Sequence, residues 1–491
     1  MESHTTLMRS RKYGDSRMLV MGLGIATLLA AWLPRLFWGF WTDEASTFWM
    51  ACEGWRVAIL RCAASPGQSN LYGIVESLFT WKGPWQEPLM RVPSVLAMGV
   101  ACWYLKRIGE ILIHAEAGWV AVVLFLCAPN IVSMGTSARP YAMALAASLA
   151  SFRYLLEWQE SGRKSTILKY LAASVITLHL HYLFGFIFVI QALYLAVCKF
   201  CGRPVGVALP LAAVIMLPAS MIPMIRHLTL TVKEAGTFAF ATPPAFLQLL
   251  QMCFHPTLLV AVGLGVLLVL IQSGKPQWRV VSLRPESYFL LIIWLVLGPV
   301  VFFAAARMTH HTLFATRFQL FTEPAFLLLL AWLVAGLQKE SRRLILLAYF
   351  AATVLNPGSL MQGWKDSVAS WREPLKLVEA KSNGITMPVF IASGLIESNS
   401  VNWENLAPAT HRLFAPLSAY PIHNPAIPLP YQFGNDVKDF VRKTRMERRC
   451  FLLAASDSEL GPWMKGYMEQ QGFHAEVVPV NDFVVIQFER N

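Results

Sequence analysis

Two adjacent carboxylates, Asp43 and Glu44, lie a few residues beyond the first long apolar segment of the chain, with aromatic residues on both sides. Acidic side chains beside a membrane are costly to desolvate, so they usually serve a site or a partner. A carboxylate held there is suited to general-base chemistry, in which it accepts a proton from an attacking hydroxyl group. The structural alternative is a helix N-terminus, where Thr42 would be the N-cap and acidic residues favour the first turn.

Arginines predicted on the same side of the membrane offer a complementary chemistry. Arg139 precedes Pro140, which favours the first turn of a helix, so we expect Arg139 at a helix N-terminus, where anions are stabilised. Arg317 stands at the outer start of another apolar segment. The planar guanidinium group donates paired hydrogen bonds to a phosphate. The alternative for both arginines is that they snorkel and anchor the ends of spans.

The histidines do not define a metal site by their spacing. His179 and His181 fall at a predicted outer turn, but no pattern of His, Cys and acidic residues around them is diagnostic of a metal. No metal ligand and no cofactor are therefore assigned, and a divalent metal is left open. Cys52 and Cys62 share the first outer loop and would be able to pair in an oxidising compartment, which the sequence does not decide.

The composition places these residues in a membrane protein. Of 491 residues, 56% are hydrophobic and 14% are charged, whereas soluble domains carry roughly 25% charged residues. Recurrent apolar segments of about 20 residues predict a polytopic α-helical membrane protein with about eleven transmembrane helices. The predicted spans are 18–37, 89–105, 117–134, 140–156, 167–180, 181–197, 204–224, 257–271, 288–306, 318–337 and 344–360.

The basic residues predict how these spans are oriented. Lys and Arg gather at the N-terminus and in alternate connections, which places the N-terminus in the cytoplasm and Asp43 outside. The net charge of +12 therefore needs no nucleic-acid partner. The first outer loop, 38–87, is rich in Trp, which is typical of short helices in the headgroup layer. The chain contains no N-glycosylation sequon, which favours a bacterial inner (plasma) membrane.

A change of composition near residue 362 predicts two domains, a transmembrane domain over 1–361 and an extracytoplasmic domain over 362–491. Short β-branched or apolar runs at 387–392, 450–456, 476–480 and 483–488 predict strands. The segments 374–381, 436–449 and 459–471 predict helices, and the alternation indicates a small α/β domain. The Pro-rich stretch 408–430 is predicted to be a long loop.

Several short segments together resemble the bacterial membrane glycosyltransferases of the C superfamily, of the protein O-mannosyltransferase and aminoarabinose transferase type (family 39-like). The resemblance covers about residues 18–340. The matching segments, in chain order, are Asp43-Glu44, Asn70-Leu71-Tyr72-Gly73, Arg91-Val92-Pro93-Ser94, Ala138-Arg139-Pro140-Tyr141-Ala142, His181-Tyr182-Leu183 and Arg317-Phe318 with Pro324.

This resemblance implies an inverting transfer of a sugar from a polyprenyl-phosphate donor to an acceptor hydroxyl at the outer face of the membrane. Asp43 would be the base and Glu44 its catalytic support. Arg139 and Arg317 would bind the donor phosphate. The implied substrate-binding residues are Tyr72, Tyr141, His181 and Tyr182.

Neither the sugar nor the acceptor can be named from the sequence: a protein, a lipid and a glycan acceptor all stay open. A transporter or flippase for a lipid-linked or anionic solute is the main alternative, and a non-catalytic scaffold is another. A transporter is expected to carry charges near the bilayer midplane and repeated halves. The charged residues here gather at one predicted surface, and no repeat is visible.

Overall fold

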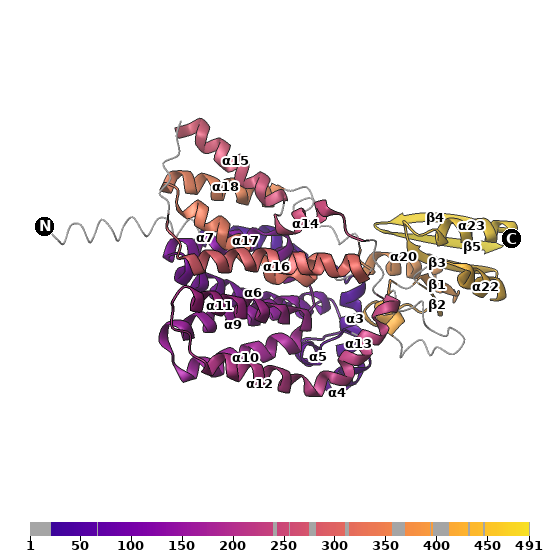
Figure 1. Cartoon of the computed structure of the whole chain (residues 1–491). Helices are drawn as coiled ribbons and strands as arrows, with labels where there is room; N and C mark the ends of the chain where they lie inside the picture. The colour runs from indigo at the N-terminus through magenta and orange to yellow at the C-terminus, as the bar shows by residue number, and fades with distance from the viewer. Residues whose placement is uncertain are drawn as a thin grey trace.

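A bundle of long apolar helices carries a small α/β domain at one end (Figure 1). The bundle and the domain are seen in a computed structural model of the chain. It describes residues 21–65, 67–238, 243–254, 256–273, 281–309, 314–355, 369–392, 394–395, 412–430, 433–444 and 447–490.

Each predicted span overlaps at least one helix of the described residues, so the predicted class of polytopic helical membrane protein is confirmed. Residues 18–20 and 356–360 of the first and last spans lie outside the described residues. By length and composition, five helices of the described residues are able to cross a membrane, or six if α7 and α8, which are bent by 67° at their break, form one span. The count of about eleven spans stays a prediction. The bundle helices are Met21–Leu36, α6 (Gln86–Leu112), α7 (Ala115–Cys127), α8 (Pro129–Gly135), α9 (Tyr141–Ser161), α10 (Lys164–Leu180), α11 (Ile187–Phe200), α12 (Ala208–Met221), α15 (Pro256–Ser273), α16 (Pro285–Thr309), α17 (Glu323–Ala335) and α18 (Lys339–Leu355).

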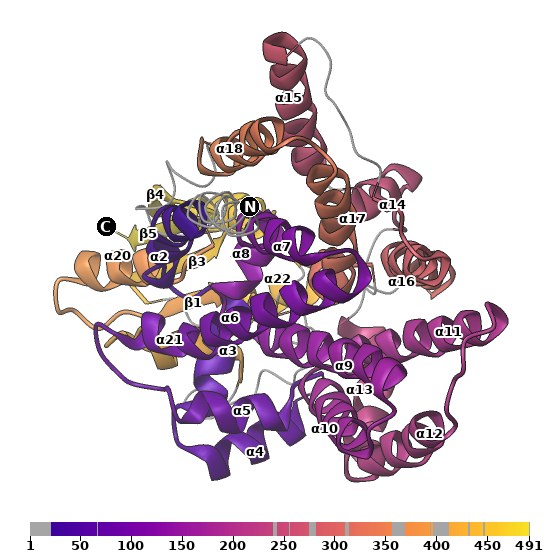
Figure 2. The same cartoon turned by 90° about the vertical axis from the view of Figure 1, so that its left-hand side faces the viewer.

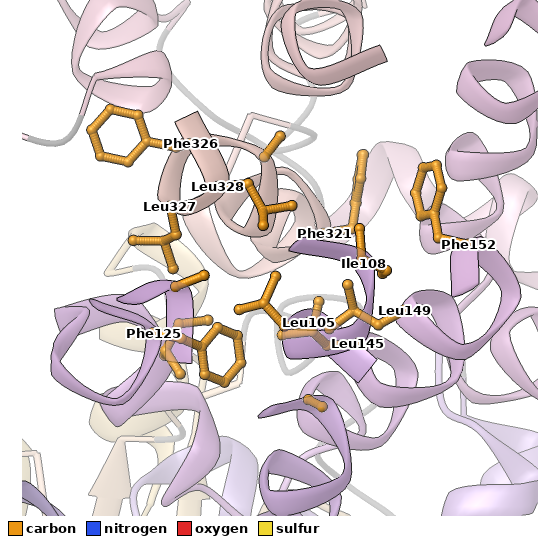
Figure 3. Packing of buried hydrophobic residues seen from close by; sticks show 14 of the residues in the cluster. Leu105, Ile108, Phe125, Leu145, Leu149, Phe152, Phe321, Phe326, Leu327 and Leu328 are labelled. Atoms are coloured by element: carbon orange, nitrogen blue, oxygen red, sulfur yellow. The ribbon is translucent and has the colours of Figure 1, made fainter. Parts of the chain in front are cut away.

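The centre of the bundle is an apolar core shared by α6, α7, α9 and α17. Leu105, Leu149 and Leu328 are fully buried there, and Figure 3 shows their side chains facing one another. Small residues let α6 and α7 approach closely, since a Cβ atom on Gly109 would lie 2.9 Å from the Cα atom of Gly118. Seen end-on, α15 and α18 lie side by side at one edge of the bundle, away from α12 (Figure 2).

Short helices cover the end of the bundle that faces the α/β domain (Figure 1). In the first predicted outer loop these are α3 (Thr42–Ala51), α4 (Trp55–Ala64) and α5 (Asn70–Ser77). Further along the chain, α13 (Ile225–Phe238) and α14 (Phe246–Cys253) follow. The short helices of the loop were predicted, and their place in the headgroup layer stays a prediction. Cys52 and Cys62 are both free thiols.

The C-terminal domain is built on a five-stranded sheet in the order β2-β1-β3-β5-β4. Strands β1, β2 and β3 are mutually parallel, while β5 runs antiparallel to β3 and β4. Two separate apolar clusters cover the two faces of the sheet, one under α22 and α23 and the other under α20. The elements are α20 (Arg372–Ser382), β1 (Val389–Ala392), α21 (Ala415–Ala419), β2 (Ala426–Leu429), α22 (Asn435–Lys443), β3 (Arg449–Ala455), α23 (Leu460–Gln470), β4 (Phe473–Val480) and β5 (Phe483–Arg490).

The predicted α/β character of this domain is confirmed, but the predicted loop over 408–430 is wrong. That stretch contains α21 and strand β2. The strand was not predicted because it contains Pro428, and proline cannot donate a ladder hydrogen bond. Strand β2 accommodates this proline because it lies at the edge of the sheet and pairs with β1 alone. The predicted domain boundary at 361/362 lies outside the described residues.

Candidate active site

Asp43 and the two predicted phosphate-binding arginines come together at the end of the bundle. Asp43 lies in the first turn of α3, Arg139 in the connection between α8 and α9, and Arg317 in the 3-10 helix η4 (Thr316–Thr322). The Asp43 Oδ2 atom is 3.9 Å from Arg139 Nη2 and 3.8 Å from Arg317 Nη1. The Asp43 side chain is 21% exposed and the Arg317 side chain 39% exposed, so the cluster is open to a ligand.

Arg139 is fixed in place while part of its guanidinium group remains free. Its Nη1 donates to the backbone carbonyl of Asp43 at 3.3 Å, to Thr47 Oγ1 at 3.2 Å and to Gln68 Oε1 at 3.4 Å. The buried Nε atoms of Arg139 and Arg317 have no hydrogen-bond partner within the described part of the chain. Buried donors are normally paired, so these two N–H groups are available to an anionic ligand.

Glu44, by contrast, points away from the open cluster and is fully engaged. It is 1% exposed and forms a two-point ion pair with Arg91, with Nε–Oε1 and Nη2–Oε2 distances of 2.9 and 2.5 Å. The backbone N–H of Ala138 also donates to Glu44 Oε1 at 2.7 Å. The pair therefore joins α3, which carries Asp43, to α6 and to the segment that carries Arg139.

Arg91 is a residue of this region for which the sequence alone indicated no role. It is 3% exposed and organises the start of the first outer loop. Its Nη1 atom donates to the carbonyl oxygens of Arg35, Leu36 and Trp38 at 2.8, 3.0 and 2.6 Å. The sequence signal that could have indicated its importance is its place in Arg91-Val92-Pro93-Ser94, one of the segments that carry the family resemblance.

An aromatic cluster borders the arginines on the side of the bundle. The Tyr141 ring lies 5.3 Å from His181 and 5.8 Å from the Arg139 guanidinium group. His181 stacks on Tyr182 at 5.8 Å and contacts Phe318 at the same centroid distance. Three of the predicted substrate-binding residues thus lie together, and Phe318 is an addition to them.

Tyr72, the fourth predicted substrate-binding residue, lies on the buried side of the site. It is 4% exposed, and Glu76, one turn along α5, is fully buried. The Tyr72 hydroxyl is close enough to Arg139 to interact with it electrostatically. Burial raises the pKa of Glu76 to about 8, and the nearby Glu44 adds to the effect.

The raised pKa of Glu76 predicts a pH-dependent stability. Between the ordinary carboxyl pKa near 4.5 and about 8, the folded chain keeps a proton that the unfolded chain releases. The folded state then binds more protons, so stability should fall as pH rises through this window. We expect Glu76→Gln to flatten the decline in melting temperature between pH 5 and 8.5, relative to the wild type in detergent. Glu53→Gln, at a half-exposed carboxylate, is the control; parallel profiles for wild type and Glu76→Gln would contradict the assignment.

Asp43 does not line the cavity that the described residues form beside the C-terminal domain. This cavity has a volume of about 910 Å³ and lies between α20, the α21–β2 connection and the first outer loop. Its acidic residues Glu53 and Glu379 are paired with Arg61 and His423. The unpaired donors of the arginine cluster, rather than this cavity, mark the candidate site for chemistry. The residues that line the cavity include Cys52, Lys82, Gln86, Lys376, Tyr420 and Asn424.

Over the ranges that the structure describes, no group of three or more His, Cys, Asp or Glu side chains is arranged to hold a metal ion.

Comparison with known proteins identifies the fold. No protein-family model and no curated sequence matches the chain. Among solved structures, the aminoarabinose transferase ArnT from Cupriavidus metallidurans bound to undecaprenyl phosphate matches with a TM-score of 0.60 and 10% identity, over 95% of this chain and 97% of that one. The same protein in the apo state gives a TM-score of 0.44 at 11% identity, with 98% of both chains covered. The Archaeoglobus fulgidus oligosaccharyltransferase gives 0.43 at 11% identity, over 95% of this chain and 74% of that one.

The first match, which spans nearly the whole of both chains, shows that this protein has the fold of ArnT, so the predicted fold is confirmed. The helices that are long and apolar enough to cross a membrane make it a multi-pass integral membrane protein.

Proposed function

We propose that this protein is an inverting glycosyltransferase that moves a sugar from a polyprenyl phosphate to an acceptor hydroxyl at the outer face of the membrane. The observation that carries the proposal is the cluster of a partly exposed carboxylate, Asp43, with two arginines whose buried Nε donors are unpaired. The structure of ArnT with undecaprenyl phosphate, which has the same fold, supports a polyprenyl-phosphate donor.

The donor phosphate would bind to the unpaired Nε groups of Arg139 and Arg317, on the side of the guanidinium groups away from the Asp43 carboxylate, which faces their Nη atoms. Each guanidinium group is planar and always charged, so the two provide charge-assisted hydrogen bonds to the phosphate oxygens. The rings of Tyr141, His181 and Tyr182 lie next to this position and would pack against the sugar or the first lipid units. The polyprenyl tail would remain in the bilayer.

The chemistry follows from these positions. The acceptor hydroxyl attacks the anomeric carbon from the face opposite the phosphate, and Asp43 takes the hydroxyl proton. The bond between the anomeric carbon and the phosphate oxygen breaks, and polyprenyl phosphate leaves with the electron pair. Arg139 and Arg317 stabilise the negative charge that develops on the leaving phosphate. Glu44 acts through Arg91 and Ala138 by holding α3 in place.

We place this site on the extracytoplasmic side of a bacterial inner membrane. Helix α9 separates Arg139 from the basic pair Arg163 and Lys164, and its 21 residues span about 30 Å. These two positive charges would lie on the cytoplasmic side by the positive-inside rule. A glycan, lipid or protein acceptor would then approach from outside, where the C-terminal domain lies beside α3.

The proposal is tested by following labelled sugar from a synthetic polyprenyl-phosphate donor in membranes that contain the chain. We expect free polyprenyl phosphate to form in step with labelled acceptor. Arg317→Ala should lower kcat by about 10²-fold, as for the loss of one charge-stabilising donor in other enzymes. Arg226→Ala, at an exposed arginine on α13, should have no effect.

Movement of the intact donor between leaflets without cleavage would instead favour the transporter alternative. Equal transfer by Arg317→Ala and the wild type would remove Arg317 from the phosphate site.

A further inference from the structure

The C-terminal domain holds the backbone of the segment that leads into Asp43. Trp371, just before α20, donates its backbone N–H to the carbonyl oxygen of Phe40 at 3.1 Å. The backbone N–H of Phe40 donates in turn to the hydroxyl oxygen of Tyr420 at 2.7 Å. Phe40 is fully buried, so both of its backbone polar groups require partners. Both partners come from the C-terminal domain, more than 300 residues away in sequence.

Side chains extend this contact to the first turns of α3. The Trp371 indole N–H donates to Thr42 Oγ1 at 3.1 Å, and Arg412 Nε donates to Ser46 Oγ at 2.8 Å. Gly394, just after β1, lies so close to Thr42 that a Cβ atom there would be 2.4 Å from Thr42 Oγ1. The residues on either side of Asp43 are therefore held directly by the C-terminal domain.

The same contact reaches the bundle through Glu87 on α6. The Tyr420 hydroxyl donates to Glu87 Oε1 at 2.8 Å, and Arg372 forms an ion pair with that carboxylate at 2.7 Å. Glu87 is 4% exposed. The Tyr420 hydroxyl thus accepts a hydrogen bond from the backbone of Phe40 and donates one to Glu87 on α6. These two bonds fix the Asp43 segment relative to the bundle.

We propose that Trp371 and Tyr420 are positioning residues for the catalytic base, so that the active site is complete only when the C-terminal domain is docked. Arg139 also donates to the Asp43 backbone carbonyl, but its further bonds to Thr47 and Gln68 would keep the phosphate site in place when the Asp43 segment moves. The catalytic part of this inference rests on the proposed function, whereas the docking contacts do not.

Hydrogen–deuterium exchange of the full chain in detergent tests the docking contacts without an activity assay. Tyr420→Phe removes only the hydroxyl that accepts from Phe40, and Trp371→Phe removes the indole N–H given to Thr42 together with one ring of a buried side chain that packs on Phe483. We expect at least tenfold faster amide exchange at Phe40 in Tyr420→Phe. Trp463→Phe is the matched control, because Trp463 stacks on Tyr467 within α23, away from this contact.

Transfer kinetics then test the positioning role. Both variants should lower kcat more than they raise the donor KM, since the phosphate arginines are retained. Thr42→Val should lower kcat as Trp371→Phe does, and the double variant should be no worse than Trp371→Phe alone, because the same hydrogen bond is removed in all three. Unchanged exchange at Phe40 would overturn the docking contact, and faster exchange with an undiminished kcat would overturn the positioning role. A wild-type chain without transfer activity would contradict the proposed function and leave the exchange result interpretable.

Discussion

Replacing Asp43 with asparagine should lower sugar transfer by about 10²–10⁴-fold, the usual contribution of a general base. The amide is nearly the same size as the carboxylate but cannot accept the hydroxyl proton. Arg139 would keep its bonds to Thr47 and Gln68, so the phosphate site should survive. The measurement is transfer of labelled sugar from a polyprenyl-phosphate donor by the purified chain.

Donor binding must be measured beside transfer in this variant. We expect Asp43→Asn to bind polyprenyl phosphate at least as tightly as the wild type, because a negative charge 3.8–3.9 Å from both arginines has been removed. Glu53→Gln is the matched control: it neutralises another carboxylate of the first outer loop, and transfer should be unaffected. Wild-type transfer by Asp43→Asn would exclude this residue as the base.

Breaking the pair between Glu44 and Arg91 should destabilise the fold by about 3–5 kcal/mol, because it leaves an uncompensated buried charge. Glu44→Gln leaves Arg91 with a neutral partner, and Arg91→Met leaves Glu44 unpaired. Both residues are no more than 3% exposed, so water cannot replace the lost partner. Thermal unfolding in detergent measures the loss.

The double variant Glu44→Leu with Arg91→Met separates stability from function. Replacing a buried ion pair with apolar side chains is often neutral or stabilising, so much of the melting temperature should return. Transfer should stay low, because Ala138 and the carbonyl oxygens of Arg35, Leu36 and Trp38 lose the bonds that fix the Asp43 segment. Recovery of both properties would show that the pair has no positioning role. A loss below 1 kcal/mol in the single variants would show that the charges are solvated.

The central residues of the candidate site could be predicted because each stands at the end of an apolar segment. Asp43, Arg139 and Arg317 are charged residues beside predicted spans, where a charged side chain is costly to desolvate unless it serves a site or a partner. The alternation of spans predicts that all three lie on the same side of the membrane, so their positions at one end of the bundle follow from the topology. The helical class and most strands of the C-terminal domain follow from the same periodic patterns.

The partners of these residues could not be predicted, because nothing local to the sequence joins them. Arg91 lies 47 positions from Glu44, and Trp371 lies 329 positions from Thr42. A charged pair that is buried by packing looks the same in a sequence as one at a surface. Strand β2 was not predicted for a different reason. Its proline is compatible with a strand only at the edge of a sheet, which is the position that β2 occupies.

The shared position of Asp43 between two arginines has a consequence for the order in which substrates bind. With no donor present, Arg139 Nη2 and Arg317 Nη1 lie 3.9 and 3.8 Å from the Asp43 carboxylate, so the carboxylate and the two guanidinium groups attract one another. A donor phosphate that binds the two guanidinium groups would neutralise them and release the carboxylate. We therefore expect a compulsory sequence in which the lipid-linked sugar binds first and the acceptor second. The donor would thereby free Asp43 to contact the acceptor, whereas in the empty site the carboxylate stays held by the two guanidinium groups.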